Sequence, residues 1–162
     1  MKKFIVICIC TVLYFNSIAQ APLSGFKFGG GLSVLAPASN LKGTSVGVGL
    51  DLLAHYSVTS QFALTADVGY NSLFPKNKDL NSLNIIPIRG GIRFYPSNKF
   101  YLGAKAGVAF VTMKDLPSTS GLGYAVGVGF RMDDKLDIGL NYEGAGNPSF
   151  GYIGLRLGYF FN

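Results

Sequence analysis

Alternation of apolar and polar residues is the feature of this chain that most limits its fold. In the segment IPIRGGIRFYP (86–96), Ile86, Ile88 and Ile92 occupy one parity, whereas Arg89 and Arg93 occupy the other. A repeat of two residues is the period of a β-strand, in which successive side chains point to opposite faces of the sheet. The segment therefore predicts a strand with one apolar face and one face of charged residues and glycine.

The same alternation recurs in eight segments that are separated by turn-forming residues. We expect strands at residues 25–36, 44–56, 62–74, 84–96, 100–111, 121–132, 136–143 and 151–161. Their lengths are close to the roughly 9–11 residues that a tilted strand needs to cross a bilayer. Longer connections are expected after the odd-numbered strands and shorter turns after the even-numbered ones. An even number of such strands indicates an up-and-down barrel.

The composition of the two faces favours a membrane barrel over a soluble one. The apolar parity carries no charged residue, while the other parity combines the charges with many of the 22 glycines. Water-facing strands are rarely so rich in glycine, but a narrow lumen needs small residues beside its large charged ones. Charged residues make up only 14% of the chain, against about 25% in soluble domains. We predict an all-β, eight-stranded antiparallel up-and-down transmembrane β-barrel whose apolar face contacts lipid.

Aromatic residues of the apolar parity gather near the predicted strand ends, as expected for the two membrane interfaces. The predicted girdle at the periplasmic end comprises Phe26, Tyr56, Phe62, Phe94, Phe100, Phe130 and Phe161. The opposite girdle comprises Tyr70, Phe110, Tyr124 and Tyr142.

Charged residues of the other parity predict an ion-pair network inside the lumen, because a buried charge must be paired. The predicted network comprises Asp51, Asp67, Arg89, Arg93, Lys105, Asp137, Arg156 and the single histidine, His55. If the 57–61 turn pairs its strands symmetrically, Asp51 faces Asp67, and we expect Arg89 and Arg93 to reach them. Two facing carboxylates could instead act as general acid and base, but a sealed lumen gives a substrate no entry. We expect no catalytic site and no metal site.

The N-terminal residues read as a secretory signal peptide. Lys2 and Lys3 precede an apolar run at residues 4–15, and small residues occupy positions 17 and 19. We expect cleavage after Ala19, with a signal peptide at 1–19 and one barrel domain at 20–162. Both cysteines would be removed with the signal, so the mature chain would carry neither a thiol nor a disulfide.

The chain resembles the small outer-membrane β-barrel proteins of the OmpA/OmpX type, the outer membrane protein beta-barrel domain family. The resemblance rests on SIAQ at the expected cleavage site, on IPIRGGIRFYP and GLGYAVGVGF, and on the closing GYIGLRLGYFF. It implies a porin-family barrel in the outer membrane of a Gram-negative bacterium.

We therefore expect a monomeric, non-enzymatic outer-membrane protein with a filled lumen and a role in envelope integrity or surface interaction. The alternatives are a narrow pore for small solutes, a lipid A-modifying enzyme, and a secreted soluble barrel that binds an apolar ligand. Outer-membrane lipid is the expected partner. Lipopolysaccharide and an unknown protein are expected contacts of the extracellular loops. The loop lysines that could make these contacts are Lys42, Lys76, Lys78 and Lys114. No run of basic residues suggests nucleic acid, and no cofactor is expected.

Overall fold

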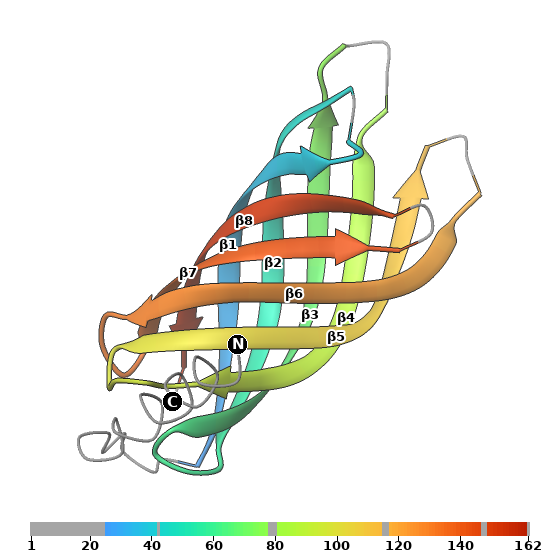
Figure 1. Ribbon diagram of the computed structural model, residues 1–162. Helices are drawn as coiled ribbons and strands as arrows, with labels where there is room; N and C mark the ends of the chain where they lie inside the picture. Colours follow the sequence, from blue (N-terminus) through green and yellow to red (C-terminus); the bar gives the residue numbers. More distant parts are fainter. Residues whose placement is uncertain (1–24, 42, 78–80, 115–116, 147–148, 162) are drawn as a thin grey trace, which may run out of the picture.

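The computed structural model describes residues 25–41, 43–77, 81–114, 117–146 and 149–161. Eight strands close into one antiparallel barrel in which every strand pairs with its neighbour in sequence and β1 pairs with β8 (Figure 1). The strands are β1 (Phe26–Ser39), β2 (Thr44–Ser57), β3 (Phe62–Pro75), β4 (Leu83–Phe94), β5 (Phe100–Met113), β6 (Thr119–Arg131), β7 (Leu136–Ala145) and β8 (Phe150–Phe160). The predicted fold class is confirmed. Closure leaves no strand with an unpaired edge, which a bilayer would not tolerate.

The two parities of the strands form two different surfaces. The apolar parity points outward, where Leu32 is 60% exposed and Leu52 is 69% exposed. The charged parity points into the lumen, where Asp67 is 2% exposed and Arg89 is 4% exposed. Burial is thus inverted relative to a water-soluble protein, in which charged side chains face the solvent. Among the described residues no helix is long and apolar enough to cross a membrane.

The connections divide the barrel into two ends. We call the end with connections 58–61, 95–99 and 132–135 the turn end, and the end with connections 40–43, 76–82, 114–118 and 146–149 the loop end. The expected alternation of long and short connections is largely wrong, because only 76–82 is clearly longer than the rest. The difference arises because β1, β5, β6 and β7 continue their pairing beyond the predicted boundaries toward the loop end.

The register between β2 and β3 corrects the predicted pairing of two aspartates. Asp51 lies opposite Gly69, and Asp67 lies opposite Leu53, so the two carboxylates are diagonal neighbours rather than direct partners. The turn explains the shift: Ser57 pairs with Ala63, and the Thr59 hydroxyl accepts hydrogen bonds from the backbone N–H groups of Gln61 and Phe62. Moving the centre of a turn by one residue moves the register by two, which preserves the inward parity.

The eleven aromatic residues of the predicted girdles all lie on the outward parity, with none among the buried side chains. Several contact one another across strands near the turn end, including Phe26 with Tyr56 at 6.3 Å and Phe62 with Phe94 at 5.0 Å between ring centroids. Tyr124 and Tyr142 form a comparable pair at 6.4 Å on β6 and β7. Phe28, Phe74 and Tyr159 are further exposed aromatics of the same outer face.

Candidate functional site

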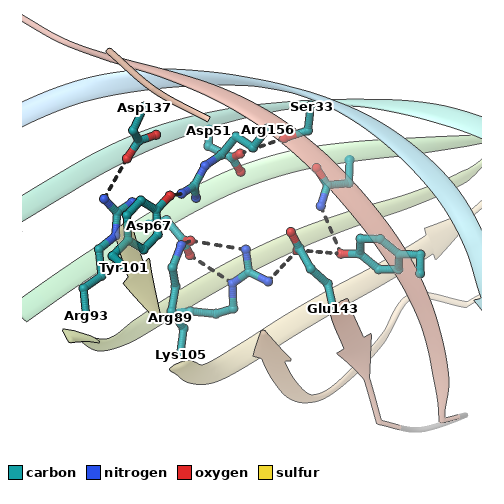
Figure 2. Close-up of polar contacts among 12 residues, drawn as sticks. Ser33, Asp51, Asp67, Arg89, Arg93, Tyr101, Lys105, Asp137, Glu143 and Arg156 are labelled. Atoms are coloured by element: carbon teal, nitrogen blue, oxygen red, sulfur yellow. Dashed lines mark hydrogen bonds and ion pairs between the residues drawn. The ribbon is translucent and has the colours of Figure 1, made fainter. Parts of the chain in front are cut away.

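The middle of the lumen holds a compact group of ionisable side chains contributed by strands from around the barrel (Figure 2). Its buried carboxylates are Asp51, Asp67, Asp137 and Glu143, and its cations are Arg89, Arg93, Lys105 and Arg156. The group thus combines four carboxyl side chains with four basic side chains, so its formal charges balance. An uncompensated charge in such a place would be strongly unfavourable.

Arg89 on β4 links two carboxylates from opposite sides of the lumen. Its Nε donates to Asp67 Oδ1 at 3.0 Å and its Nη2 donates to Asp67 Oδ2 at 3.2 Å. Its Nη1 donates to Glu143 Oε2 at 2.6 Å, which connects β4 to β7. Two N–H donors of the planar guanidinium thus bind Asp67, and a third N–H donor binds Glu143. These three hydrogen bonds hold the side chain in one orientation.

Asp67 also accepts a hydrogen bond from the Lys105 ammonium, which reaches it from β5. This carboxylate is therefore shared between two cations, and its side chain is completely buried. The backbone register explains the arrangement, because Asp67 lies directly opposite Arg89 in the β3–β4 ladder.

Arg93 does not reach Asp51 or Asp67, contrary to our expectation. Its Nη1 donates to Asp137 Oδ2 at 2.7 Å, and its guanidinium lies 4.2 Å from the centroid of the Tyr101 ring. Arg93 follows Arg89 by four residues, a separation of roughly 13 Å along an extended strand. Arg93 therefore lies closer to the turn end than Arg89 does, and there it meets Asp137 of β7.

Asp51 and Arg156 belong to the same group of charges but form no ion pair among the described residues. Ser33 Oγ donates to Asp51 Oδ2 at 3.4 Å, and Arg156 Nη2 donates to the Tyr101 hydroxyl at 3.5 Å. Both side chains pass over Gly31, where a Cβ would lie 3.1 Å from Arg156 and 3.5 Å from Asp51. Asp51 and Arg156 are therefore neighbours without a direct contact between their charged atoms. The expected pairing of Asp51 with Arg89 or Arg93 is also wrong, because both arginines pair with other carboxylates.

The loop end of the lumen holds a cluster of buried apolar side chains. The buried cluster there consists of Leu35, Leu73, Leu83, Ile85, Ala109, Ala145, Phe150 and Tyr152. Tyr152 joins this layer to the charges: its hydroxyl accepts from Asn71 Nδ2 at 3.0 Å and donates to Glu143 Oε2 at 3.3 Å. Ion pairs thus occupy the middle of the lumen, and buried apolar side chains occupy its loop end.

The turn end contains a small cleft, and His55 lies in it as a buried side chain. The cleft has a cavity volume of only about 20 Å³ and is lined by polar and aromatic groups that include Lys27, Tyr95, Arg131 and Phe160. The His55 ring contacts Tyr95 and Phe160 edge to face, with centroids at 6.1 Å and 5.9 Å. This placement agrees with the predicted inward parity of His55, but its ion-pair role remains a prediction.

One serine–histidine contact occurs in this cleft, between Ser57 Oγ and His55 Nε2 at 3.3 Å. The other ring nitrogen, Nδ1, has no hydrogen-bond partner among the described residues. A nucleophilic triad requires an acceptor at that atom to orient the ring, so the contact is an incomplete arrangement. The described residues also contain no cluster of three or more histidine, cysteine or acidic residues that could hold a metal ion.

Two of the predicted loop lysines and several unpredicted residues are placed by the structure. Lys76 and Lys114 are exposed at the loop end, while Lys42, Lys78 and the expected signal peptide lie outside the described residues. Sequence reasoning did not assign roles to Ser33, Tyr101, Glu143 and Tyr152, which contact the network. Their lumen-facing parity was readable in the sequence, but the choice of partner was not.

Comparison with known proteins identifies one family along nearly the whole chain. The outer membrane protein beta-barrel domain family matches residues 7–161. Comparison with curated protein sequences gives no significant match.

Solved structures of outer-membrane barrels share the fold at low sequence identity. Neisserial surface protein A is 19% identical, with a TM-score of 0.65, and the match covers 85% of this chain and 96% of that one. The N-terminal β-barrel domain of OprF from Pseudomonas aeruginosa is 11% identical, with a TM-score of 0.61 and coverages of 82% and 97%. Ail, the attachment invasion locus protein of Yersinia pestis, is 17% identical, with a TM-score of 0.56 and coverages of 84% and 96%.

The match confirms the family resemblance, and the inverted burial of the closed barrel has the form that a bilayer requires. The chain belongs to the outer membrane protein beta-barrel domain family and is an integral barrel of the bacterial outer membrane.

Proposed function

We propose that this protein is a closed outer-membrane barrel that contributes to envelope structure and presents its loop end as a contact surface, and that it neither conducts solutes nor catalyses a reaction. The observation that carries this proposal is the filling of the lumen. Arg89 joins carboxylates from β3 and β7 across the middle, and an apolar cluster occupies the loop end. An eight-stranded barrel has an interior just wide enough for its side chains, so these two layers leave no continuous aqueous path.

Conductance in planar lipid bilayers tests this closure against the pore alternative. The purified full-length protein should give no discrete channel openings, while a large porin inserted under the same conditions serves as the positive control. Reproducible openings whose size follows the salt concentration would overturn the proposal and favour a narrow pore.

The enzymatic alternative has less support from the geometry. The His55–Ser57 contact lies at the turn end and lacks a partner at Nδ1 among the described residues. A lipid A-modifying enzyme would work at the outer leaflet, which we place at the loop end. Mass spectra of lipid A from cells that overproduce the protein should therefore be unchanged, and a new lipid A species that disappears with His55→Ala would contradict this.

We further propose that the loop end is extracellular and that its lysines contact the phosphate groups of lipopolysaccharide. Lys76 and Lys114 are exposed there, and short loops that carry such charges are common contact surfaces. Replacing both with glutamate should reduce the lipopolysaccharide that co-purifies with the barrel, whereas the same exchange at Lys99 and Lys135 of the turn end should not. Equal co-purification in both variants would count against the assignment.

Export through a cleaved signal peptide at residues 1–19 is part of the same proposal. Its support is the basic start, the apolar run and the small residues before position 20. N-terminal sequencing of the protein from outer membranes should begin at Gln20.

A further inference from the structure

The turn end of the lumen is filled by aromatic and basic side chains that pack ring against ring. The Tyr95 ring contacts the Tyr101 ring at 5.7 Å between centroids, and the Arg131 guanidinium lies 4.6 Å from the Tyr95 centroid. The His55 ring contacts both Tyr95 and Phe160 edge to face. We call these five residues the turn-end plug, and its central ring, that of Tyr95, is 3% exposed.

The plug accommodates an uncharged His55 ring better than a protonated one. Ser57 Oγ lies 3.3 Å from Nε2, but Nδ1 is buried and has no hydrogen-bond partner among the described residues. A protonated imidazole carries an N–H on both nitrogens, so Nδ1 would become a charged donor without an acceptor, which is strongly unfavourable in a buried place. The cavity beside it, about 20 Å³, has room for little more than one water molecule, so solvent would not hydrate the charge.

The charged groups around His55 also disfavour a protonated ring. The basic side chains that line its cleft are Lys27 of β1, Arg93 of β4 and Arg131 of β6, and the acidic ones are Asp133, Asp134 and Asp137. Of the three carboxylates only Asp137 is buried, and Arg93 already pairs with it at 2.7 Å. Asp133 is exposed and its Oδ1 accepts from two backbone N–H groups of its own turn. A protonated His55 would therefore be a fourth cation beside one buried carboxylate that is in use.

Few bonds hold the plug closed, and none of them belongs to the central ion pairs. Arg131 forms no ion pair among the described residues, and Lys27 Nζ reaches only the Asp134 carbonyl oxygen at 3.0 Å. Arg89 binds its carboxylates in the middle of the lumen without contacting the plug. We propose that His55 makes the turn-end plug an acid-sensitive switch, in which uptake of a proton by the ring opens the turn end while the central ion pairs and the loop end stay closed.

The size of the response follows from the presence of a single histidine in the chain. Histidine is the side chain whose ordinary pKa lies between pH 5 and 8. A ring released by opening takes up a proton with an ordinary pKa of about 6.5, whereas the closed plug excludes the proton, so acid favours the open form. The equilibrium constant for opening should rise about 30-fold between about pH 7.5 and about pH 5.0.

Hydrogen exchange of the full-length barrel in phosphatidylethanolamine–phosphatidylglycerol vesicles, followed by mass spectrometry, tests the switch. His55→Gln carries no titrating group at this position, so the ratio of the natural chain to this variant cancels the intrinsic pH dependence of exchange. That ratio should rise about 30-fold on acidification in the turn-end segments 53–57 and 95–101 and stay constant in the loop-end segment 83–87. Identical pH profiles for the two proteins would overturn the proposal. So would an equal rise at both ends of the barrel, which would mean global destabilisation instead of a local switch.

A second measurement needs no variant and holds even if His55→Gln does not fold. The NMR signals of isotopically labelled histidine in the natural chain report the protonation state of the one imidazole. At about pH 5.0 most of the folded protein should still carry the uncharged ring, while exchange at the turn end is raised. A ring that becomes protonated near its ordinary pKa with no increase in exchange would contradict the proposal, because the closed plug would then accept the proton.

Discussion

Asp67 and Asp51 are similar carboxylates in very different surroundings. Both face the lumen from neighbouring strands, and they are 2% and 9% exposed. Asp67 is engaged by Arg89 and Lys105, whereas Asp51 accepts a single hydrogen bond from Ser33 at 3.4 Å. Two residues of the same type and the same parity thus differ in the cations that engage them.

The difference follows from what lies opposite each aspartate in the sheet. Asp67 pairs with Arg89 on β4, and Lys105 on β5 is close enough to share it. Asp51 pairs with Gly31 on β1 and with Gly69 on β3, so neither neighbouring strand offers a cation at its level. The contrast teaches that register, rather than burial or residue type, assigns the strong ion pairs in a narrow barrel.

The largest effect is expected for Asp67→Asn. The change leaves Arg89 and Lys105 facing a neutral amide in the buried middle of the lumen, and removing one partner of a buried ion pair costs about 3–5 kcal/mol. Urea unfolding in phospholipid vesicles, followed by circular dichroism, measures the change in the free energy of unfolding. A loss no larger than that of Asp51→Asn would break the contrast between the two aspartates.

A smaller loss, about 3 kcal/mol at the lower end of the same range, is expected for Asp137→Asn, because this change removes the carboxylate partner of one cation, Arg93, rather than of two. The Tyr101 ring remains beside the guanidinium and retains part of its stabilisation. The same unfolding measurement applies, and Asp137→Asn combined with Tyr101→Leu should cost more than Asp137→Asn alone. If the double variant were no less stable, the ring would have no role in holding Arg93.

The smallest effect, at most about 1 kcal/mol, is expected for Asp51→Asn. An asparagine oxygen can still accept from Ser33, and no ion pair is lost among the described residues. Ser33→Ala should have an equally small effect. A loss of several kcal/mol in Asp51→Asn would mean that Arg156 depends on this carboxylate after all.

Much of the fold was predictable because it depends on local patterning. Parity alone placed Leu52 outward and Arg89 inward, since a strand alternates its faces regardless of which strand lies beside it. The loop-end boundaries were harder to predict, because residues such as Pro37 and Ala38 in β1 resemble a turn in sequence but continue the strand. Pairing with the neighbouring strands overrides their local preference.

The sequence by itself determined that the chain forms strands, that they number eight, and which side chains face lipid and which face the lumen. The partners of the charges were decided only by the tertiary structure. Arg89 with Glu143 and Arg93 with Asp137 each join β4 to β7, two strands that are not adjacent in the sheet. These pairs exist because closure folds the sheet back on itself and brings opposite walls within the reach of an arginine.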